Sequence, residues 1–529
     1  MKKFVVFFLA GLLILAFGAT VYAQAPKLEF RASGWIDTQT YISQNVPPYT
    51  PVQGMYNALV PNMGGFNAAA FAAGGPGFQP VFDSRGEPID PLNKTSAMWD
   101  SRMHLKFDAV MGKELSGTLY FEIDAFRWGN NPGIHINNTG GWGSWATDHG
   151  SVEVKNLYID FGLPYFGIPV PVTARIGAQP LGIRPNVLVY TDGTGLTGGI
   201  KLDPVMISPM YFKALEGLDW NSDDVDVYGL NANVKVSTFT IGGYGLYYNM
   251  DTYPFTVGSA AYNAAIPTGT QKAKMWWWGA YADGKLGPID LNFDFIYDYG
   301  RVLSTLSPVD IAPDVKYRGW LTRLKINYPW EKFNFGVTGL YASGSNADRT
   351  HPSGLPGSIT QAGVPSDKVS GFVVPVGSES GPANGESAVF YGMEAGAMGG
   401  ISNSMGANYN TLSKGPFGGS WFAKVFGSYS VTPSYKVTLQ YLYIGDTTKN
   451  GNTMGTAWDF QRGTLRNDST IGHELNLINE WQIYRNLTFK FWGGYMWAGD
   501  AMDIFNPVTG SNFSMHNPWA VRTRLMYTF

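Results

Sequence analysis

The sequence predicts an all-β fold, a closed antiparallel transmembrane β-barrel of about 18 strands with short periplasmic turns and long extracellular loops. Three observations predict it. Apolar and polar side chains alternate along many segments, as they do in strands with one apolar and one wetted face. The connections between these segments are alternately short and long. The chain also begins with the features of a secretory signal.

The composition excludes several classes of protein. The 529 residues are 44% hydrophobic and 15% charged, with 66 Gly and 15% aromatic residues, a balance that favours strands and turns over disorder. The net charge of −3 gives no attraction to nucleic acid. No cysteine is present, which excludes disulfides, cysteine zinc sites, iron–sulfur clusters and cysteine-attached haem. No cofactor or metal is expected.

The N-terminal segment predicts secretion. Lys2 and Lys3 precede an apolar run over residues 4–17, and Val21-Tyr22-Ala23 supplies an A-x-A-like cleavage pattern. We expect residues 1–23 to be a signal peptide cleaved after Ala23, and 24–529 to form a single barrel domain. The alternative, a membrane anchor, is disfavoured because the run is short for a span of about 20 residues. The remaining compartments are the periplasm, the exterior and the outer membrane.

The final segment illustrates the alternation. Trp519, Val521, Leu525, Tyr527 and Phe529 fall on one face of a strand, and Arg522 and Arg524 fall on the other. One such strand would also suit a soluble sandwich, whereas many in succession favour a barrel. The strand-like segments lie at 27–42, 98–110, 116–128, 151–162, 170–179, 194–203, 208–216, 224–236, 238–250, 272–286, 288–299, 316–328, 331–343, 417–430, 433–446, 470–483, 486–499 and 517–529.

The lengths of the connections follow the parity of the strands. After even-numbered strands they are brief, as at 111–114, 328–331, 431–434 and 484–485. After odd-numbered strands they are long, at 43–97, 129–150, 251–271, 300–315, 344–416, 447–469 and 500–516. Transmembrane barrels have this asymmetry, and a soluble sandwich has no reason for it. The last strand must pair with the first, because an open sheet edge is not tolerated in hydrocarbon.

Aromatic residues gather near the ends of strands. Trp276, Trp277 and Trp278, with Tyr247 and Tyr248 nearby, suit the interfacial girdles of a membrane barrel. Three consecutive tryptophans are unusual for the core of a soluble protein, because successive side chains of a strand point to opposite faces.

Three stretches resemble known proteins. The ending Tyr527-Thr528-Phe529 resembles the C-terminal signal that the barrel assembly machinery reads in Gram-negative outer-membrane barrels. The stretches 471–477 (IGHELNL) and 491–500 (FWGGYMWAGD) resemble the alginate-export type of porin. The resemblance implies an eighteen-stranded channel in the outer membrane, with Tyr527 and Phe529 as the assembly signal.

Motifs for chemistry are weak. Residues 193–198 match G-x-G-x-x-G, but no helix is expected after them, so we interpret them as a flexible loop with close backbone packing. Asp219, Asn221 and Asp223 imitate the start of a calcium loop that lacks its central Gly and closing Glu; a solvated acidic loop is the simpler interpretation, with a weak calcium or lipid-A-bridging site as the alternative. No enzyme is expected, although an active site built across strands stays open.

Alternation also predicts which charges line the interior. A basic seam gathers where the last strands meet the first, and it consists of Arg31, Arg102, Lys106, Lys490, Arg522 and Arg524. The acidic pore-lining residues are Glu122, Asp124, Asp290, Asp294 and Asp298. Opposed basic and acidic walls would orient dipolar solutes and select ions. The alternative is that these charges pair across strands and keep the wall hydrated.

The predicted function is that of an outer-membrane porin for passive diffusion of small hydrophilic solutes or ions. At least one of the loops 43–97 and 344–416 is expected to fold over or into the barrel and limit solute size, the alternative being a mobile surface loop. The expected partners are outer-membrane lipid and lipopolysaccharide, the barrel assembly machinery and the solutes, with a homo-oligomer as an open possibility. Two other functions remain: export of an acidic polysaccharide, and a barrel sheath around partner cytochromes.

Overall fold

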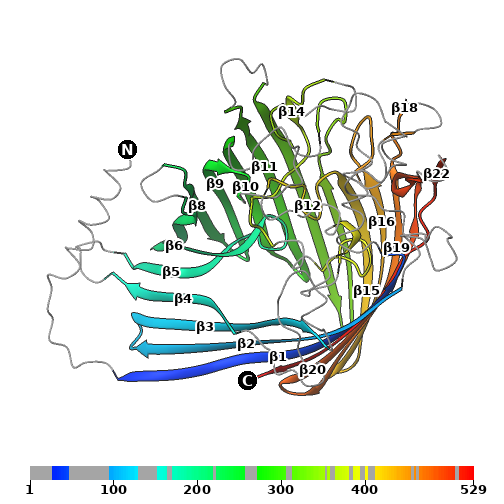
Figure 1. Cartoon of the computed structure of the whole chain (residues 1–529). Helices are drawn as coiled ribbons and strands as arrows, with labels where there is room; N and C mark the ends of the chain where they lie inside the picture. The colour runs from blue at the N-terminus through cyan, green and yellow to red at the C-terminus, as the bar shows by residue number, and fades with distance from the viewer. Residues whose placement is uncertain are drawn as a thin grey trace, which may run out of the picture.

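The computed structural model (Figure 1) describes most of the chain. The described residues are 27–46, 95–128, 152–163, 170–217, 222–255, 271–305, 313–351, 354–357, 364–379, 385–392, 400–402, 411–453, 458–459, 464–506 and 511–529. The predicted signal peptide and most of the loop 43–97 lie outside them.

Eighteen long antiparallel strands form one closed barrel. Each strand pairs with its neighbour in chain order, and the last strand returns to pair with the first over Trp35–Gln44. Their bounds are β1 Leu28–Gln44, β2 Thr95–Met111, β3 Leu115–Arg127, β4 Glu153–Gly162, β5 Val172–Ile183, β6 Val189–Leu202, β7 Val205–Leu215, β8 Val225–Val236, β9 Phe239–Tyr253, β10 Gln271–Leu286, β11 Ile289–Leu303, β12 Val315–Trp330, β13 Phe333–Ala342, β15 Ser420–Thr432, β16 Tyr435–Asp446, β19 Thr470–Tyr484, β20 Leu487–Ala498 and β23 Trp519–Thr528.

The smaller elements lie in the connections. β14 (Lys368–Val369) adds to the barrel wall by parallel pairing with β12. β17 (Trp458–Asp459) pairs with β18 (Thr464–Leu465), and β21 (Ile504–Asn506) pairs with β22 (Ser511–Phe513). A 3₁₀ turn, η1, covers Asp500–Met502. No helix in the described part of the chain is long and apolar enough to span a membrane.

The two ends of the barrel differ in their connections. At one end, here called the turn end, six of the eight connections have two residues, for example 237–238 and 485–486. At the other, the loop end, the connections include 304–314, 343–419 and 447–469. The C-terminus lies beside β1 at the turn end (Figure 1), where Gly34 and Phe529 exchange backbone hydrogen bonds of 2.9 and 3.0 Å.

The outer surface is apolar in the pattern expected of a membrane-facing wall. Large apolar side chains at alternate strand positions are exposed, such as Leu475 and Leu477 on β19 and Leu439 on β16. Aromatic rings form a girdle near the loop end, where Tyr247 stacks on Trp276 at 4.3 Å and Trp276 on Trp278 at 5.0 Å. A closed barrel with this surface is a transmembrane barrel, because closure leaves no open strand edge in the ring of long strands.

The predicted fold class is therefore confirmed, and strand boundaries agree within a few residues, with two exceptions. β5 and β6 are longer than predicted, so their loop-end connection is only 184–188. The flexible loop predicted for the glycine motif 193–198 is wrong, because these residues lie within β6. The close packing is present, however: a Cβ added to Gly195 would stand 2.2 Å from the carbonyl oxygen of Tyr211.

Candidate functional site

The interior of the barrel has two different halves. Toward the loop end of β8 to β12 the inward side chains are apolar and fully buried, including Val225, Leu246, Tyr248, Met250 and Met275. Toward the turn end the inward side chains are polar and charged. The interior surface is therefore polar in one half only.

A segment of the longest loop covers the apolar half. We call the described residues 370–379, 385–392, 400–402 and 411–419 of this loop the inner segment; β14, just before it, lies in the wall instead. The inner segment contributes the buried side chains Phe372, Val374, Val389, Phe390 and Phe417. These belong to the same core as the inward residues of the strands. The prediction that a long loop folds into the barrel is confirmed for this part of 344–416.

The first attachment of the inner segment is to β10, β11 and β12. The indole Nε1 of Trp277 donates to the carbonyl oxygen of Val373 at 2.8 Å. The carboxylate of Asp298 accepts from the backbone N–H of Val373 at 3.2 Å and from that of Gly319 at 2.8 Å. Both side chains are completely buried, so the wall holds the segment through its backbone.

The second attachment is to the short connection between β5 and β6. The hydroxyl of Ser378 donates to the carbonyl oxygen of Leu188 at 3.0 Å, and the N–H of Glu379 donates to the carbonyl oxygen of Tyr190 at 2.6 Å. The segment thus extends from the wall at β11 and β12 to the loop end of β6, which lies several strands away in the sheet.

The third attachment is to β19. The carboxylate of Glu474 accepts three backbone N–H groups, from Ala388 at 2.8 Å, Val389 at 2.8 Å and Phe390 at 2.9 Å. Asn476 Oδ1 also accepts from Ala388 at 2.9 Å. Glu474 is fully buried, and these N–H groups replace the water that an ionised carboxylate would otherwise need. The inner segment therefore contacts opposite parts of the wall.

A buried ion-pair network fixes the segment between these attachments. Glu386 lies against Lys424 of β15 and Arg323 of β12. Burial alone would raise the pKa of the Glu386 carboxyl, but the two cations outweigh it and hold that pKa at about 2. Lys424 also donates to the backbone oxygen of Glu386 at 3.2 Å.

A second charged cluster ties the β5–β6 connection to the wall. Arg184 forms an ion pair with Asp283 of β10 at 2.6 Å and another with Asp294 of β11. Its guanidinium lies 4.7 Å from the ring centroid of Tyr281. The connection 184–188 and the inner segment therefore both occupy space inside the barrel.

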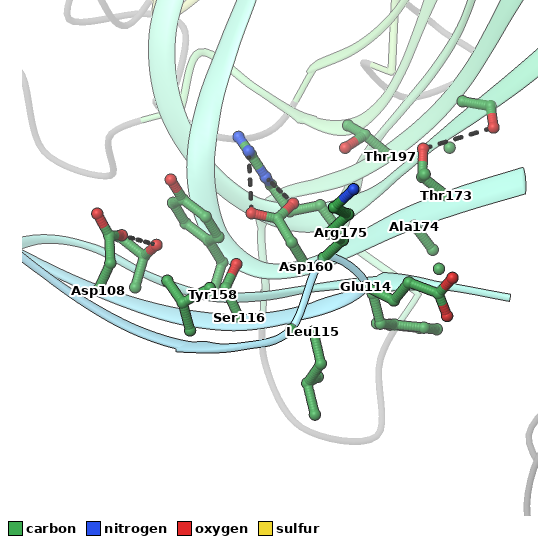
Figure 2. A pocket seen from close by; sticks show the side chains of 18 of the residues that line it. Asp108, Glu114, Leu115, Ser116, Tyr158, Asp160, Thr173, Ala174, Arg175 and Thr197 are labelled. Carbon is green, nitrogen blue, oxygen red and sulfur yellow. Dashed lines mark hydrogen bonds and ion pairs between the residues drawn. The ribbon is translucent and has the colours of Figure 1, made fainter. Parts of the chain in front are cut away.

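The turn-end half contains an open cavity of about 770 Å³ beside β1 to β7 (Figure 2). Arg175 reaches Asp160 with two hydrogen bonds of 2.7 and 3.1 Å and lies 4.1 Å over the ring of Tyr158. Asp108 accepts from Thr118 at 2.6 Å and pairs with Lys106 at 3.1 Å. The lining mixes both charge signs with hydroxyl groups, which suits small hydrated solutes better than a single polyanion.

The residues of the predicted basic seam lie together on β2, β1, β23 and β20, and they are engaged by neighbouring side chains. Arg524 contacts Asp37 at 2.6 Å, Lys490 contacts Glu480 at 3.1 Å, and Lys106 contacts Asp108. The remaining pairs are Arg31 with Glu29 at 3.0 Å and Arg102 with Glu122 at 3.7 Å. Arg522 donates to Gln39 and lies 5.6 Å from the ring centroid of Trp492. Three of these pairs, those of Arg102, Lys490 and Arg524, join neighbouring strands, and the other two join residues of the same strand.

The predicted acidic residues lie in separate environments. Glu122 accepts from His104 at 2.7 Å and from Lys155 at 2.6 Å, and Asp290 pairs with Lys285 at 3.1 Å. Asp294 and Asp298 point inward but are covered by Arg184 and by the inner segment. The side chain of Asp124 lies outside the described residues. Tyr527 and Phe529 are exposed on the outer face, with ring centroids 5.8 Å apart.

Sequence reasoning missed Glu386 and Glu474, which attach the inner segment, and Arg184, which attaches the β5–β6 connection to the wall. One signal was available: in β9 and β10 both faces are apolar or aromatic near the loop end, as in Tyr247-Tyr248 and 276–278. Inward apolar residues in a barrel require a cover, because they would otherwise face water. Among the described residues, no cluster of acidic or histidine side chains is arranged to hold a metal ion.

Comparisons with known proteins give a structural likeness only. No family model matches the chain, and no curated protein matches it, so the resemblance to alginate-export channels gains no support. Pseudomonas aeruginosa OccK8 (OprE) gives 10% identity and a TM-score of 0.47 over 95% of this chain and 98% of that one. Acinetobacter baumannii OccAB3 is 8% identical, with a TM-score of 0.47 over 94% of this chain and 99% of that one. The outer membrane protein opdK from Pseudomonas aeruginosa is 10% identical, with a TM-score of 0.44 over 94% of this chain and 98% of that one.

Proposed function

We propose that this chain is an outer-membrane channel for passive diffusion of small hydrophilic solutes or ions, and that the inner segment sets the width of its bore. The turn end then faces the periplasm, and the loop end faces the exterior. The observation that carries the proposal is the division of the interior. A polar cavity of about 770 Å³ lies at one end, and a segment attached to opposite walls lies at the other.

The polar lining supports solute passage. Charged pairs such as Arg175 with Asp160 are about one-third exposed on each partner, so water reaches them. Mixed charge of this kind keeps a passage hydrated without binding one solute tightly. The fully buried pairs around Glu386 lie on the inner segment and its contacts instead, where they hold structure.

The inner segment can be removed, together with β14, without breaking the ring of 18 long strands, because β13 pairs directly with β15. The N–H of Gly419 donates to the carbonyl oxygen of Ser343 at 3.3 Å, so the two ends of the loop lie side by side. Deleting residues 345–417 joins Gly344 to Gly418 and leaves a two-residue Gly-Gly hairpin between β13 and β15, a connection that such a pair of strands favours.

Single-channel recording in planar bilayers tests the proposal on the full mature chain and on this deletion. We expect a small, steady current from the full chain and a severalfold larger one from the deletion. Equal currents would contradict the role of the inner segment. Absence of current from both would contradict a channel, and blockage of the deletion variant by an acidic polysaccharide alone would favour an exporter.

A further inference from the structure

A row of four cations crosses the outer face of the barrel near the loop end. Lys274 on β10 is directly opposite Arg301 on β11, Arg301 is opposite Lys316 on β12, and Lys316 is opposite Lys368 on β14. All four side chains are exposed. Directly opposed residues on neighbouring strands are about 5 Å apart, so the row is about 15 Å long. We call these four residues the outer basic row.

Such a row costs stability in the isolated protein. Like charges directly opposite one another on adjacent strands are destabilising. Asp314 reaches Arg301 at 3.4 Å, and Asp367, which pairs with Arg349, also interacts electrostatically with Lys316. Within the part of the chain that the structure describes, no carboxylate lies within 4.0 Å of Lys274, Lys316 or Lys368. The positive charge of the row is therefore only partly neutralised by the protein.

The row lies immediately outside the aromatic girdle. On the same outer face, the next row of residues lies two positions closer to the turn end. In this row Trp276 is opposite Tyr299, and Tyr299 is opposite Arg318. Arg318 adds a fifth cation, 5.6 Å from the ring centroid of Tyr299. Two residues equal about 7 Å along a strand, and girdle rings lie at the headgroup level of a membrane. The row therefore sits where the charged part of a lipid headgroup would be.

Among the strand residues that the structure describes, the outward positive charge without a close carboxylate is concentrated in this sector of the wall. Near the loop end of β15 to β20 the outward positions hold Trp421, Tyr443, His473 and Trp497, whose rings contact one another. On β7 to β9 the outward Lys213 is neutralised by Asp224 at 2.7 Å and Asp226 at 3.6 Å. A general need for interfacial anchoring would spread cations around the barrel, so their concentration on β10 to β14 indicates one localised anionic ligand.

We propose that the outer basic row, with Arg318, is a binding site for the phosphate groups of a phosphorylated glycolipid in the leaflet at the loop end. Phosphate oxygens accept strong charge-assisted hydrogen bonds from Lys and Arg, and the acyl chains of the same lipid would lie along the girdle and the apolar wall below. The inference rests on the membrane orientation given in the proposed function but not on conduction.

The test measures lipid binding to the detergent-purified full chain by its tryptophan fluorescence, since Trp276 and Trp278 adjoin the row. The probes are bis-phosphorylated lipid A, the same lipid with its phosphates removed, and inorganic phosphate. The variant is Lys274→Gln with Arg301→Gln and Lys316→Gln. The matched control is Lys113→Gln with Lys332→Gln, two exposed cations at the turn end.

We expect the triple variant to bind phosphorylated lipid A roughly tenfold to a hundredfold more weakly, since each cation near an anionic lipid surface contributes on the order of fivefold. The control should bind as the native chain does, and Lys274→Arg with Lys316→Arg should retain binding. The proposal would be overturned if the native chain bound the dephosphorylated lipid as tightly as phosphorylated lipid A. It would also be overturned if the triple variant bound phosphorylated lipid A as tightly as the native chain does. If inorganic phosphate at the same concentration displaced phosphorylated lipid A, the site would be a phosphate site and the lipid would not be its specific ligand.

Single-channel current separates this proposal from the channel itself. The triple variant should conduct as the native chain does, because its substituted residues lie on the outer face. Loss of lipid binding with unchanged current supports the site, whereas absence of current in both proteins refutes the channel and leaves the lipid result standing.

Discussion

The indole Nε1 of Trp277 donates to the carbonyl oxygen of Val373 at 2.8 Å, which joins β10 to a segment 96 residues further along the chain. Asp298 and Glu474 make contacts of the same kind, because both bind backbone N–H groups of the inner segment. These wall side chains bind the backbone of the segment. The segment adds a charged contact of its own, because its Glu386 carboxylate pairs with Arg323 and Lys424.

Glu474→Gln tests this attachment. An amide in place of the carboxylate keeps one acceptor oxygen but loses the charge that three N–H groups share. Hydrogen bonds to ionised groups contribute roughly 1.5–3 kcal/mol each, so we expect docking of the segment to weaken by about 2–4 kcal/mol. Hydrogen exchange of residues 385–392 should accelerate, and single-channel current should increase.

Glu480→Gln is the matched control for that change. Glu480 lies on the same strand and also faces inward, but it pairs with Lys436 and Lys490. We expect it to leave exchange at 385–392 unchanged. Similar acceleration in both variants would mean that loss of any β19 carboxylate loosens the barrel as a whole.

The wall could be predicted from sequence because its rule is local. In 276–278 the period of two places Trp276 and Trp278 outward and Trp277 inward, and the same rule places Arg524 and Lys490 on one inner surface. Closure follows as well, because pairing of the last strand with β1 satisfies the remaining edge groups. Neither result requires knowledge of distant contacts.

The inner segment could not be predicted in detail, because its partners are set by the three-dimensional arrangement. Nothing local to Glu386 indicates that Arg323 and Lys424 will meet it, and Arg184 finds Asp283 at a separation of 99 residues. The ion pairs of the basic seam could not be predicted from the sequence either. Alternation placed its cations on the inner face, but their pairing with Asp37 and Glu480 depends on neighbouring strands and side-chain reach.

The pKa of Glu386 predicts an acid-dependent opening. That pKa is about 2 in the structure, where burial is opposed by Lys424 and Arg323, and its ordinary value is 4.5. A depressed pKa stabilises the docked segment above pH 4.5, and this contribution, on the order of 3 kcal/mol, is lost as the pH falls from 4.5 to 2. We expect the part of the current that depends on Glu386 to be constant above pH 4.5 and to increase below it.

Glu386→Gln provides the comparison for the pH experiment. It removes the titrating group and leaves Arg323 and Lys424 buried without their carboxylate, so current should already be raised at pH 7 and should lose most of its acid dependence. A native acid response that persists in this variant would assign the effect to other carboxylates.

The seam pair Arg524 and Asp37 predicts a loss of barrel stability. Their side chains are 9% and 0% exposed, and removal of one partner of a buried pair typically costs about 3–5 kcal/mol. We expect Arg524→Gln to lower the free energy of unfolding by roughly 3 kcal/mol, measured by urea titration in detergent. Asp37→Asn combined with Arg524→Gln should recover part of this loss, and an additive loss would mean that the two residues are not coupled.

Arg175 predicts how the cavity selects ions. Its guanidinium is 33% exposed at the cavity, and partly exposed charges of this kind contribute roughly 0.5 kcal/mol. We expect Arg175→Gln to move the cation-to-anion permeability ratio about twofold toward cations, as measured by reversal potentials in a salt gradient. Arg318→Gln, on the outer face, should leave the ratio unchanged, and an equal shift would show that general surface charge is responsible.

The aromatic ending predicts a separation between assembly in the cell and folding in detergent. Tyr527 and Phe529 are exposed on the outer face, so Tyr527→Ser with Phe529→Ser removes little buried apolar surface, and the backbone bonds between Gly34 and Phe529 do not depend on the ring. If these rings are an assembly signal, the variant should refold from urea into detergent as the native chain does but accumulate poorly in the membrane fraction of expressing cells. Defective refolding of the variant in detergent would assign the two rings to the stability of the seam instead. Gly34→Val should show that opposite pattern, because an added Cβ would lie 2.3 Å from the carbonyl oxygen of His104 and disturb the seam in either setting.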